Sequence, residues 1–207
     1  MSQAAAVGHA PTVDTYQNPL TPESWSKLAM WIFLAGDAMS FGGLLAAYGA
    51  LRYGSPNWPI PMSVLGIFMT GVMTFLLICS SVTMVKGLAA IQDGDRQRMC
   101  MFLGLTILGG ITFLCMQAFE WSHLIHEGLG LTQNPWGASQ FGTTFFMTTG
   151  FHGCHVFGGV CYLSVILIQG LRGKYSRTNW SSVETAGLYW HFVDLVWILV
   201  FTFVYLV

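Results

Sequence analysis

Residues 183–207 read VETAGLYWHFVDLVWILVFTFVYLV, and this stretch decides the fold. It is long and apolar enough to cross a bilayer as a helix, yet it contains Glu184, His191 and Asp194. Their spacings of seven and three place all three on one helical face. A charged group near the bilayer centre costs at least about 2.5–3.5 kcal/mol. This face must therefore pack against protein, trapped water or another polar group.

The composition is that of an integral membrane protein. Of the 207 residues, 54% are hydrophobic and 8% are charged, whereas soluble domains contain about 25% charged residues. The net charge of -1 and the lack of a basic tract exclude nucleic-acid binding, which needs clustered Lys and Arg. None of the five cysteines belongs to a CxxC or CxxCH motif, so we expect neither attached haem nor structural zinc.

Five apolar segments predict an all-α bundle of five transmembrane helices. They cover residues 28–51, 62–85, 99–120, 141–169 and 185–207, each long enough for about 30 Å of hydrocarbon. Residues 1–27 form a polar N-terminal segment without the basic start and apolar run of a signal peptide. Within it, Thr21, Pro22 and Glu23 predict the start of a helix. Residues 28–207 form the membrane domain.

The basic residues predict the orientation. Seven of the eight lie beside the N-terminus, the second loop or the fourth loop, which share one side of a five-span protein; they are Lys27, Lys86, Arg96, Arg98, Arg172, Lys174 and Arg177. Arg52 lies on the other side. Because cytoplasmic loops are rich in Lys and Arg, we expect a cytoplasmic N-terminus and a C-terminus outside.

Asp37 lies near the middle of the first span, with no basic residue within one helical turn. Two hypotheses stay open for this intramembrane carboxyl group. It is a proton-binding or coupling site, or it forms a hydrogen bond that holds two helices together.

The second and third spans carry uncharged polar groups and one acid. Thr70, Thr74 and Ser81, at spacings of four and seven, predict a helix-packing face. In the third span, we expect Gln117 and Glu120 to bond neighbouring helices. Glu120 and the histidine three residues later form a single ExxH pair, whereas a di-iron centre needs two such pairs and two further glutamates. We therefore expect no metal on this chain.

The fourth span carries His152 and His155 on one stripe, with four glycines nearby. Together with His191 of the fifth span, they raise the hypothesis of bound haem, but the glycines favour tight helix packing. We favour hydrogen-bonded histidines that join the fourth span to the fifth. Glu184 has a second interpretation, because Ser181 and Glu184 match the pattern of a capping box.

Several motifs follow one another on the five spans. They are WIF at 31–33 with Asp37, SSVT at 80–83, Gln117 with Glu120 and Trp121, TGFHGCHV at 149–156, and YWHFVDLVW at 189–197 with Glu184 upstream. Together they resemble the motifs of subunit III of the haem-copper terminal oxidases, the cytochrome c oxidase subunit 3 family, in its five-helix short form. The resemblance covers nearly the whole chain beyond residue 27.

The resemblance implies a non-catalytic core subunit of a proton-pumping aa-type cytochrome c oxidase in an aerobic respiratory chain. It implies haem and copper in subunits I and II, none on this chain, and bound phospholipid. The expected partners are subunit I as the main contact, subunit II, membrane lipids and a respiratory supercomplex, in a bacterial plasma membrane. The expected helix-packing or proton-related residues, beside the intramembrane Asp37, are Gln117, Glu120, His152, His155, Glu184, His191 and Asp194.

Two alternatives remain open. Many family members carry a glutamate where this chain has Asp37, and the shorter acid occurs in the quinol-oxidising branch, so subunit III of a quinol oxidase is the first alternative. The second is a free-standing proton-coupled transporter that uses Asp37 and the intramembrane histidines as a relay. Five spans do not divide into the two inverted repeats that many transporters contain.

Overall fold

The structure is a computed structural model that describes residues 25–207. Its helices are α1 (Trp25–Gly54), α2 (Pro61–Val64), α3 (Ile67–Gln92), α4 (Arg96–His126), α5 (Gln140–Leu171) and α6 (Ser181–Val200), which continues as the π-helical η1 (Phe201–Leu206). Five helices in these residues are long and apolar enough to cross a membrane. This confirms the predicted five-helix membrane bundle. The helix start predicted at Thr21, Pro22 and Glu23 lies outside the described residues.

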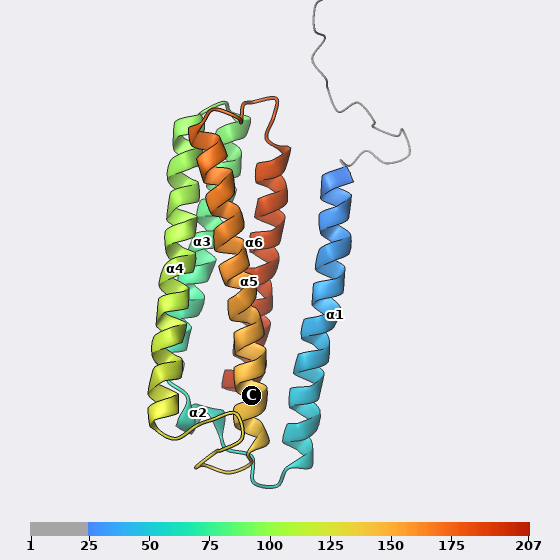
Figure 1. Ribbon diagram of the computed structural model, residues 1–207, viewed down its shortest axis with the longest axis vertical. Helices are drawn as coiled ribbons and strands as arrows, with labels where there is room; N and C mark the ends of the chain where they lie inside the picture. The colour runs from blue at the N-terminus through green and yellow to red at the C-terminus, as the bar shows by residue number, and fades with distance from the viewer. Residues whose placement is uncertain (1–24) are drawn as a thin grey trace, which may run out of the picture.

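The helices α3, α4, α5 and α6 form a four-helix bundle, and α1 lies along its outside (Figure 1). Contacts of α3 with α4, α4 with α5, α5 with α6 and α6 with α3 close a ring, while α1 touches α5 and α6. The turn after α3, the loop after α5 and the start of α1 lie at one end of the molecule (Figure 1). That end therefore holds the seven basic residues on which the predicted orientation depends.

The second predicted span was wrong at both ends. Pro61 begins the single-turn helix α2, as a proline can at the first helical position. Leu65 is extended and Gly66 precedes the first residue of α3, so the membrane helix begins five residues later than residue 62. It then continues past Val85 and ends at Gln92 before Gly94, whose φ of 89° is left-handed and ends the helix as glycine commonly does.

Trp190 of α6 fills the centre of the bundle. Its side chain is 1% exposed, and its Nε1 donates a hydrogen bond to Ser80 Oγ of α3 at 3.0 Å. The ring also lies against two glycines: a Cβ atom on Gly110 of α4 would stand 2.6 Å from Trp190 Cη2, and one on Gly159 of α5 would stand 3.0 Å from Trp190 Cε3. One side chain thus fixes the spacing of all four bundle helices.

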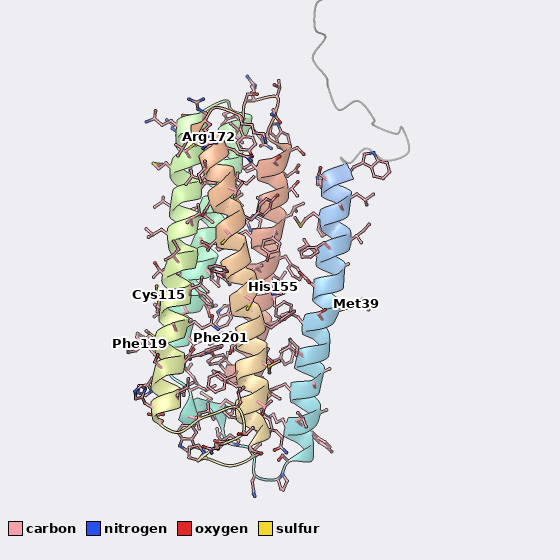
Figure 2. The ribbon with its side chains drawn as sticks, viewed as in Figure 1. Met39, Cys115, Phe119, His155, Arg172 and Phe201 are labelled. Atoms are coloured by element: carbon pink, nitrogen blue, oxygen red, sulfur yellow. The ribbon has the colours of Figure 1, made fainter. Side chains whose placement is uncertain are left out.

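Trp197 repeats this arrangement two turns along α6. Its Nε1 donates to Thr74 Oγ1 of α3 at 3.0 Å, and its ring contacts Phe113 of α4 and His152 of α5, with centroids 4.7 and 4.8 Å away. The outside of the bundle is apolar, as Met39 on α1 and Phe119 on α4 illustrate (Figure 2). This surface suits a hydrocarbon environment.

Candidate functional site

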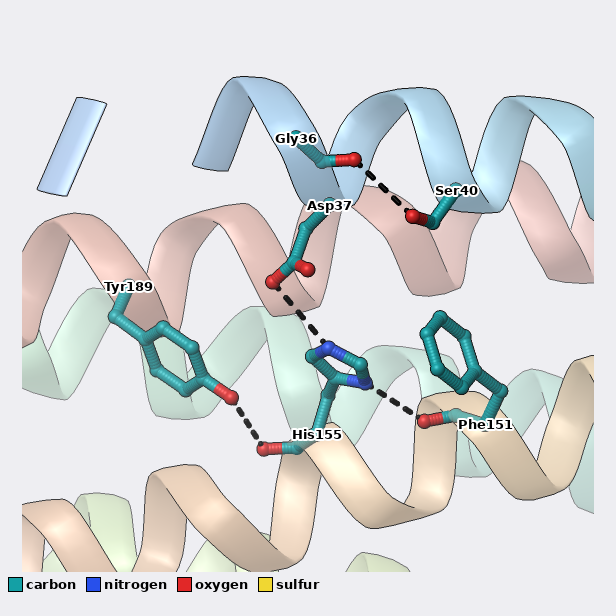
Figure 3. A network of polar contacts seen from close by, with 6 residues as sticks. All are labelled: Gly36, Asp37, Ser40, Phe151, His155 and Tyr189. Carbon is teal, nitrogen blue, oxygen red and sulfur yellow. Dashed lines mark hydrogen bonds and ion pairs between the residues drawn. The ribbon is translucent and has the colours of Figure 1, made fainter. Parts of the chain in front are cut away.

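Asp37 of α1 faces His155 of α5 at the junction between the outer helix and the bundle (Figure 3). Asp37 Oδ2 lies 3.3 Å from His155 Nε2, a distance suited to an ion pair. The other ring nitrogen, Nδ1, lies 2.8 Å from the Phe151 carbonyl oxygen. Tyr189 of α6 donates its hydroxyl proton to the backbone carbonyl of His155 at 3.0 Å. Three helices therefore meet at His155.

The Asp37–His155 contact has the separation of an ion pair without the geometry of a hydrogen bond, because Asp37 Oδ2 has no hydrogen-bond partner among residues 25–207. A carbonyl oxygen only accepts hydrogen bonds, so His155 Nδ1 must carry a hydrogen to bond Phe151. With Nδ1 protonated, a neutral ring has a lone pair at Nε2, which would repel a carboxylate. The contact is attractive when a proton resides on either Nε2 or Oδ2. The pair is then neutral overall, which lowers its cost inside the membrane.

The predicted hydrogen bonds from the His152 and His155 rings to the fifth span are not present among the described residues. The ring of His155 faces α1, and it is the His155 backbone that contacts α6. His152 is fully buried against Phe41, Phe113 and Trp197, and neither ring nitrogen has a hydrogen-bond partner within residues 25–207. Helical spacing placed both histidines on one stripe, but the stripe is wide enough for its two edges to face different neighbours. The tight packing expected from the glycines is present.

His191 and Asp194 form a polar cluster with Ser81 of α3. Ser81 Oγ donates to Asp194 Oδ2 at 2.6 Å, and His191 Nδ1 lies 3.3 Å from the same hydroxyl. Because the hydroxyl hydrogen points to Asp194, His191 Nδ1 must be the donor in the second contact. The pairing residue, Ser81, belongs to the hydroxyl face predicted on the second span.

Glu184 does not share this cluster, and it does not form the predicted capping box. Its Oε1 lies 3.1 Å from Lys27 Nζ of α1, whereas Ser181 is already the first residue of α6 and the residue before it makes no side-chain cap. Glu184 thus forms an ion pair with another helix instead of a hydrogen bond at the start of its own helix. Glu184 and Asp37 are two of three polar attachments of α1; the third is the Tyr48 hydroxyl, which donates to the Val204 carbonyl oxygen of η1 at 3.3 Å.

Glu120 connects the other end of the bundle. It is 7% exposed, and its two oxygens accept separate hydrogen bonds, from Thr70 Oγ1 of α3 at 3.0 Å and from Tyr205 Oη of η1 at 3.1 Å. Gln117, one turn earlier on α4, donates from Nε2 to the Thr149 carbonyl oxygen of α5 at 2.8 Å. In this structure both side chains bond neighbouring helices. Tyr205 was missed because nothing in its own segment distinguishes it from the other aromatic residues.

The hydroxyl face predicted on the second span is also confirmed. Thr70 bonds Glu120, Thr74 accepts from Trp197, and Ser81 bonds Asp194. Each hydroxyl therefore meets a polar side chain of another helix. Within the described residues, no group of three or more His, Cys, Asp or Glu side chains is placed to hold a metal ion.

Comparison with known proteins identifies the family. The family model described as cytochrome c oxidase subunit III matches residues 22–207. The chain belongs to the cytochrome c oxidase subunit III family. The matched region contains every residue of the polar contacts described above, from Lys27 to Tyr205. The resemblance inferred from the motifs is confirmed.

Relatives from several bacteria support the subunit III assignment. Cytochrome c oxidase subunit 3 of Synechocystis sp. is 42% identical over 177 residues, which cover 84% of this chain and 72% of the relative. The subunit 3 of Bacillus subtilis is 32% identical over 199 residues, 95% of this chain and 94% of the relative. That of Alkalihalophilus pseudofirmus is 30% identical over 204 residues, with 98% and 97% covered. With its five spanning helices, this subunit III chain is a multi-pass protein of the bacterial plasma membrane.

Proposed function

We propose that this chain is a core subunit, without a redox centre of its own, in a proton-pumping aa-type cytochrome c oxidase. In this proposal it packs beside subunit I, which carries haem and copper together with subunit II, and it stabilises subunit I and supports proton uptake. The observation that carries the proposal is the family match over residues 22–207. Bound phospholipid and a respiratory supercomplex remain predictions.

The contacts of the buried acidic side chains support a structural role for this subunit. Glu120, Asp194 and Glu184 each bond a side chain of another helix, so these acids hold the subunit together. Asp37 differs from them, because its partner is a histidine that can exchange a proton with it. We therefore assign the proton-related role within this subunit to the Asp37–His155 pair, and the packing role to the other polar residues.

The proposed orientation has the N-terminus in the cytoplasm and the C-terminus outside. It is supported by the seven basic residues near the end of the molecule that includes the start of α1 (Figure 1). In this orientation Lys27 and Glu184 lie towards the cytoplasm, and Glu120 lies towards the outside.

Purification through this chain from native membranes tests the proposed function. We expect haem a bands in the redox spectrum, and two partners in the mass spectrum: a large multi-span protein and a copper-binding protein. Oxidation of reduced cytochrome c by the preparation would then assign the electron donor, whereas activity with quinol alone would favour the quinol oxidase alternative. A colourless preparation of this chain alone would contradict the oxidase proposal and favour the transporter.

Replacing Asp37 by Asn separates its two proposed roles. Asn preserves the shape of Asp37 but does not titrate, so we expect the oxidase to assemble normally while its proton-to-electron ratio falls or its activity decays faster during turnover. Ser40→Ala is the matched control. Ser40 lies one turn after Asp37 on α1, and its hydroxyl donates to the Gly36 carbonyl oxygen of the same helix. If Asp37→Asn changes neither the proton-to-electron ratio nor the rate at which activity decays, the Asp37–His155 pair serves only to pack α1 against α5.

A further inference from the structure

A pocket opens between α2, the start of α3 and the last two turns of α4, and we call it the α2–α4 pocket. It has a volume of about 710 Å³. Figure 1 shows α2 beside the end of α4, away from the end of the molecule that holds the seven basic residues. The residues of its wall that matter below are Gly66, Met69, Phe119, Glu120, Glu127 and Trp136.

The charged side chains of this wall are acidic. Glu120 and Glu127 line the pocket, and no Lys or Arg is among the described residues that do. Glu120 is mostly buried, yet its two partners, Thr70 and Tyr205, are neutral hydroxyls. Glu127 Oε1 lies 3.6 Å from His123 Nδ1, a contact that balances its charge only when the histidine is protonated. The pocket therefore attracts a cation.

An organic ammonium group suits the pocket better than a metal ion. In residues 25–207, no group of three or more His, Cys, Asp or Glu side chains is placed to hold a metal ion. A primary ammonium has three N–H donors, and a carboxylate can accept about four hydrogen bonds, so Glu120 can still accept. Trp136 and Phe119 also line the pocket, and aromatic rings attract ammonium groups.

The start of α3 supplies the opposite partial charge. Leu65 is extended and Gly66 precedes the first residue of α3, and the first backbone N–H groups of a helix lack an acceptor within it. Gly66 and Met69 line the pocket. Such N–H groups attract phosphate. One pocket therefore offers acidic side chains to an ammonium and a helix N-terminus to a phosphate.

The depth of the pocket in the membrane favours a lipid as the occupant. Glu120 lies roughly 9 Å before the end of α4 at His126, at about 1.5 Å per residue. The headgroup layer of a bilayer is about 5–8 Å thick on each side, so the pocket spans this layer. Phe119, which is 64% exposed, continues the wall onto the apolar outside of α4 (Figure 2). Acyl chains can lie there, whereas a water-soluble amine has no such part.

The geometry points to a binding site for an aminophospholipid in the α2–α4 pocket. Its primary ammonium donates to Glu120 and Glu127, its phosphate faces the first N–H groups of α3, and its acyl chains run along Phe119. The inference rests on the bound phospholipid of the proposed function, and it adds the headgroup class and the position of that lipid.

Titration of the purified preparation with single lipids, followed by native mass spectrometry, tests the site. The lipids are dioleoyl phosphatidylethanolamine, dioleoyl phosphatidylcholine, whose ammonium has no N–H donor, and dioleoyl phosphatidylglycerol, which has no ammonium. We expect phosphatidylethanolamine to bind most tightly. Glu127→Gln should weaken its binding about tenfold, as the loss of a hydrogen bond to a charged group does. Binding of phosphatidylglycerol should not weaken.

Asp93→Asn is the matched control for Glu127→Gln. Asp93 is the C-cap of α3, as Glu127 is the C-cap of α4, and it lies in the turn after α3, which is at the other end of the molecule (Figure 1). This variant is expected to bind phosphatidylethanolamine as the wild-type chain does. Equal effects of the two substitutions, or equal affinities for the three lipids, would overturn the site.

A photo-crosslinking phenylalanine analogue at position 119 identifies the occupant in the intact preparation. We expect a crosslink to phosphatidylethanolamine, and crosslinking to a partner subunit instead would overturn the lipid assignment. A haem-containing preparation without lipid preference overturns the site while the oxidase proposal stands. A colourless preparation that still prefers phosphatidylethanolamine overturns the oxidase proposal while the site stands.

Discussion

Gly110→Val is expected to leave little correctly folded protein. A Cβ atom at Gly110 would stand 2.6 Å from Trp190 Cη2 and 2.7 Å from Val160 Cγ2, distances that real structures do not tolerate. Neither neighbour can move away easily. The Trp190 ring is held by its bond to Ser80 and by Gly159 on its other side. Overpacking a core costs about 1–3 kcal/mol and occasionally more, and here it would separate α4 from both α5 and α6.

Gly104→Val is the control for this prediction. Gly104 lies on the same helix, and a Cβ atom there would meet nothing within 4 Å, so this variant carries the change in helix propensity without the clash. Fluorescence-detected size exclusion in mild detergent should give a monodisperse peak for Gly104→Val and aggregate for Gly110→Val. Trp190→Leu in the Gly110→Val background should recover part of the peak, because it removes the larger obstacle. Equal behaviour of the two glycine variants would show that Trp190 does not set the helix spacing.

Glu120→Leu is expected to lower the thermal unfolding temperature in detergent markedly, whereas Glu120→Gln should lower it less. Leucine leaves the Tyr205 hydroxyl, on a fully buried side chain, without its acceptor. An orphaned buried donor costs about 1–3 kcal/mol. Thr70 also loses its bond to Glu120, but its single hydroxyl hydrogen can donate to the Gly66 carbonyl oxygen instead. Glutamine still offers one acceptor, and either hydroxyl can accept from its amide.

A second substitution shows whether the orphaned hydroxyl is the cause. Adding Tyr205→Phe to Glu120→Leu removes that hydroxyl, so the double variant should unfold at a higher temperature than Glu120→Leu alone. Replacing both partners of a buried bond by apolar groups is often nearly neutral. Simple addition of the two single losses would contradict the coupling of Glu120 to Tyr205.

The membrane helices could be predicted from the sequence because an apolar run of about 20 residues by itself indicates a membrane-spanning helix. Their ends were less predictable, since the break at Leu65 and Gly66 lies inside an otherwise apolar segment. The hydroxyl face of the second span was also predictable, because its residues recur at helical spacing and small hydroxyl side chains bond across helix interfaces in a membrane.

The partners of the polar residues were not predictable from local patterns. Asp37 pairs with a histidine on α5, and Glu184 pairs with Lys27 rather than with the start of its own helix. Both outcomes depend on how α1 lies against the bundle, which no spacing within one helix specifies. The position of Trp190 between Gly110 and Gly159 likewise requires three helices to be in place.

The position of α1 outside the ring has a consequence for biosynthesis. Asp37 enters the membrane early, but His155 follows it only about 120 residues later in the chain. At synthesis rates of about 5–20 residues per second, this interval lasts roughly 6–24 s. During that time α1 is a single helix whose acid lacks its partner, and an unpaired Asp adds about 2.5–3.5 kcal/mol to the free energy of insertion. The apolar residues of α1 must therefore supply enough insertion energy to hold it in the bilayer until α5 and α6 arrive.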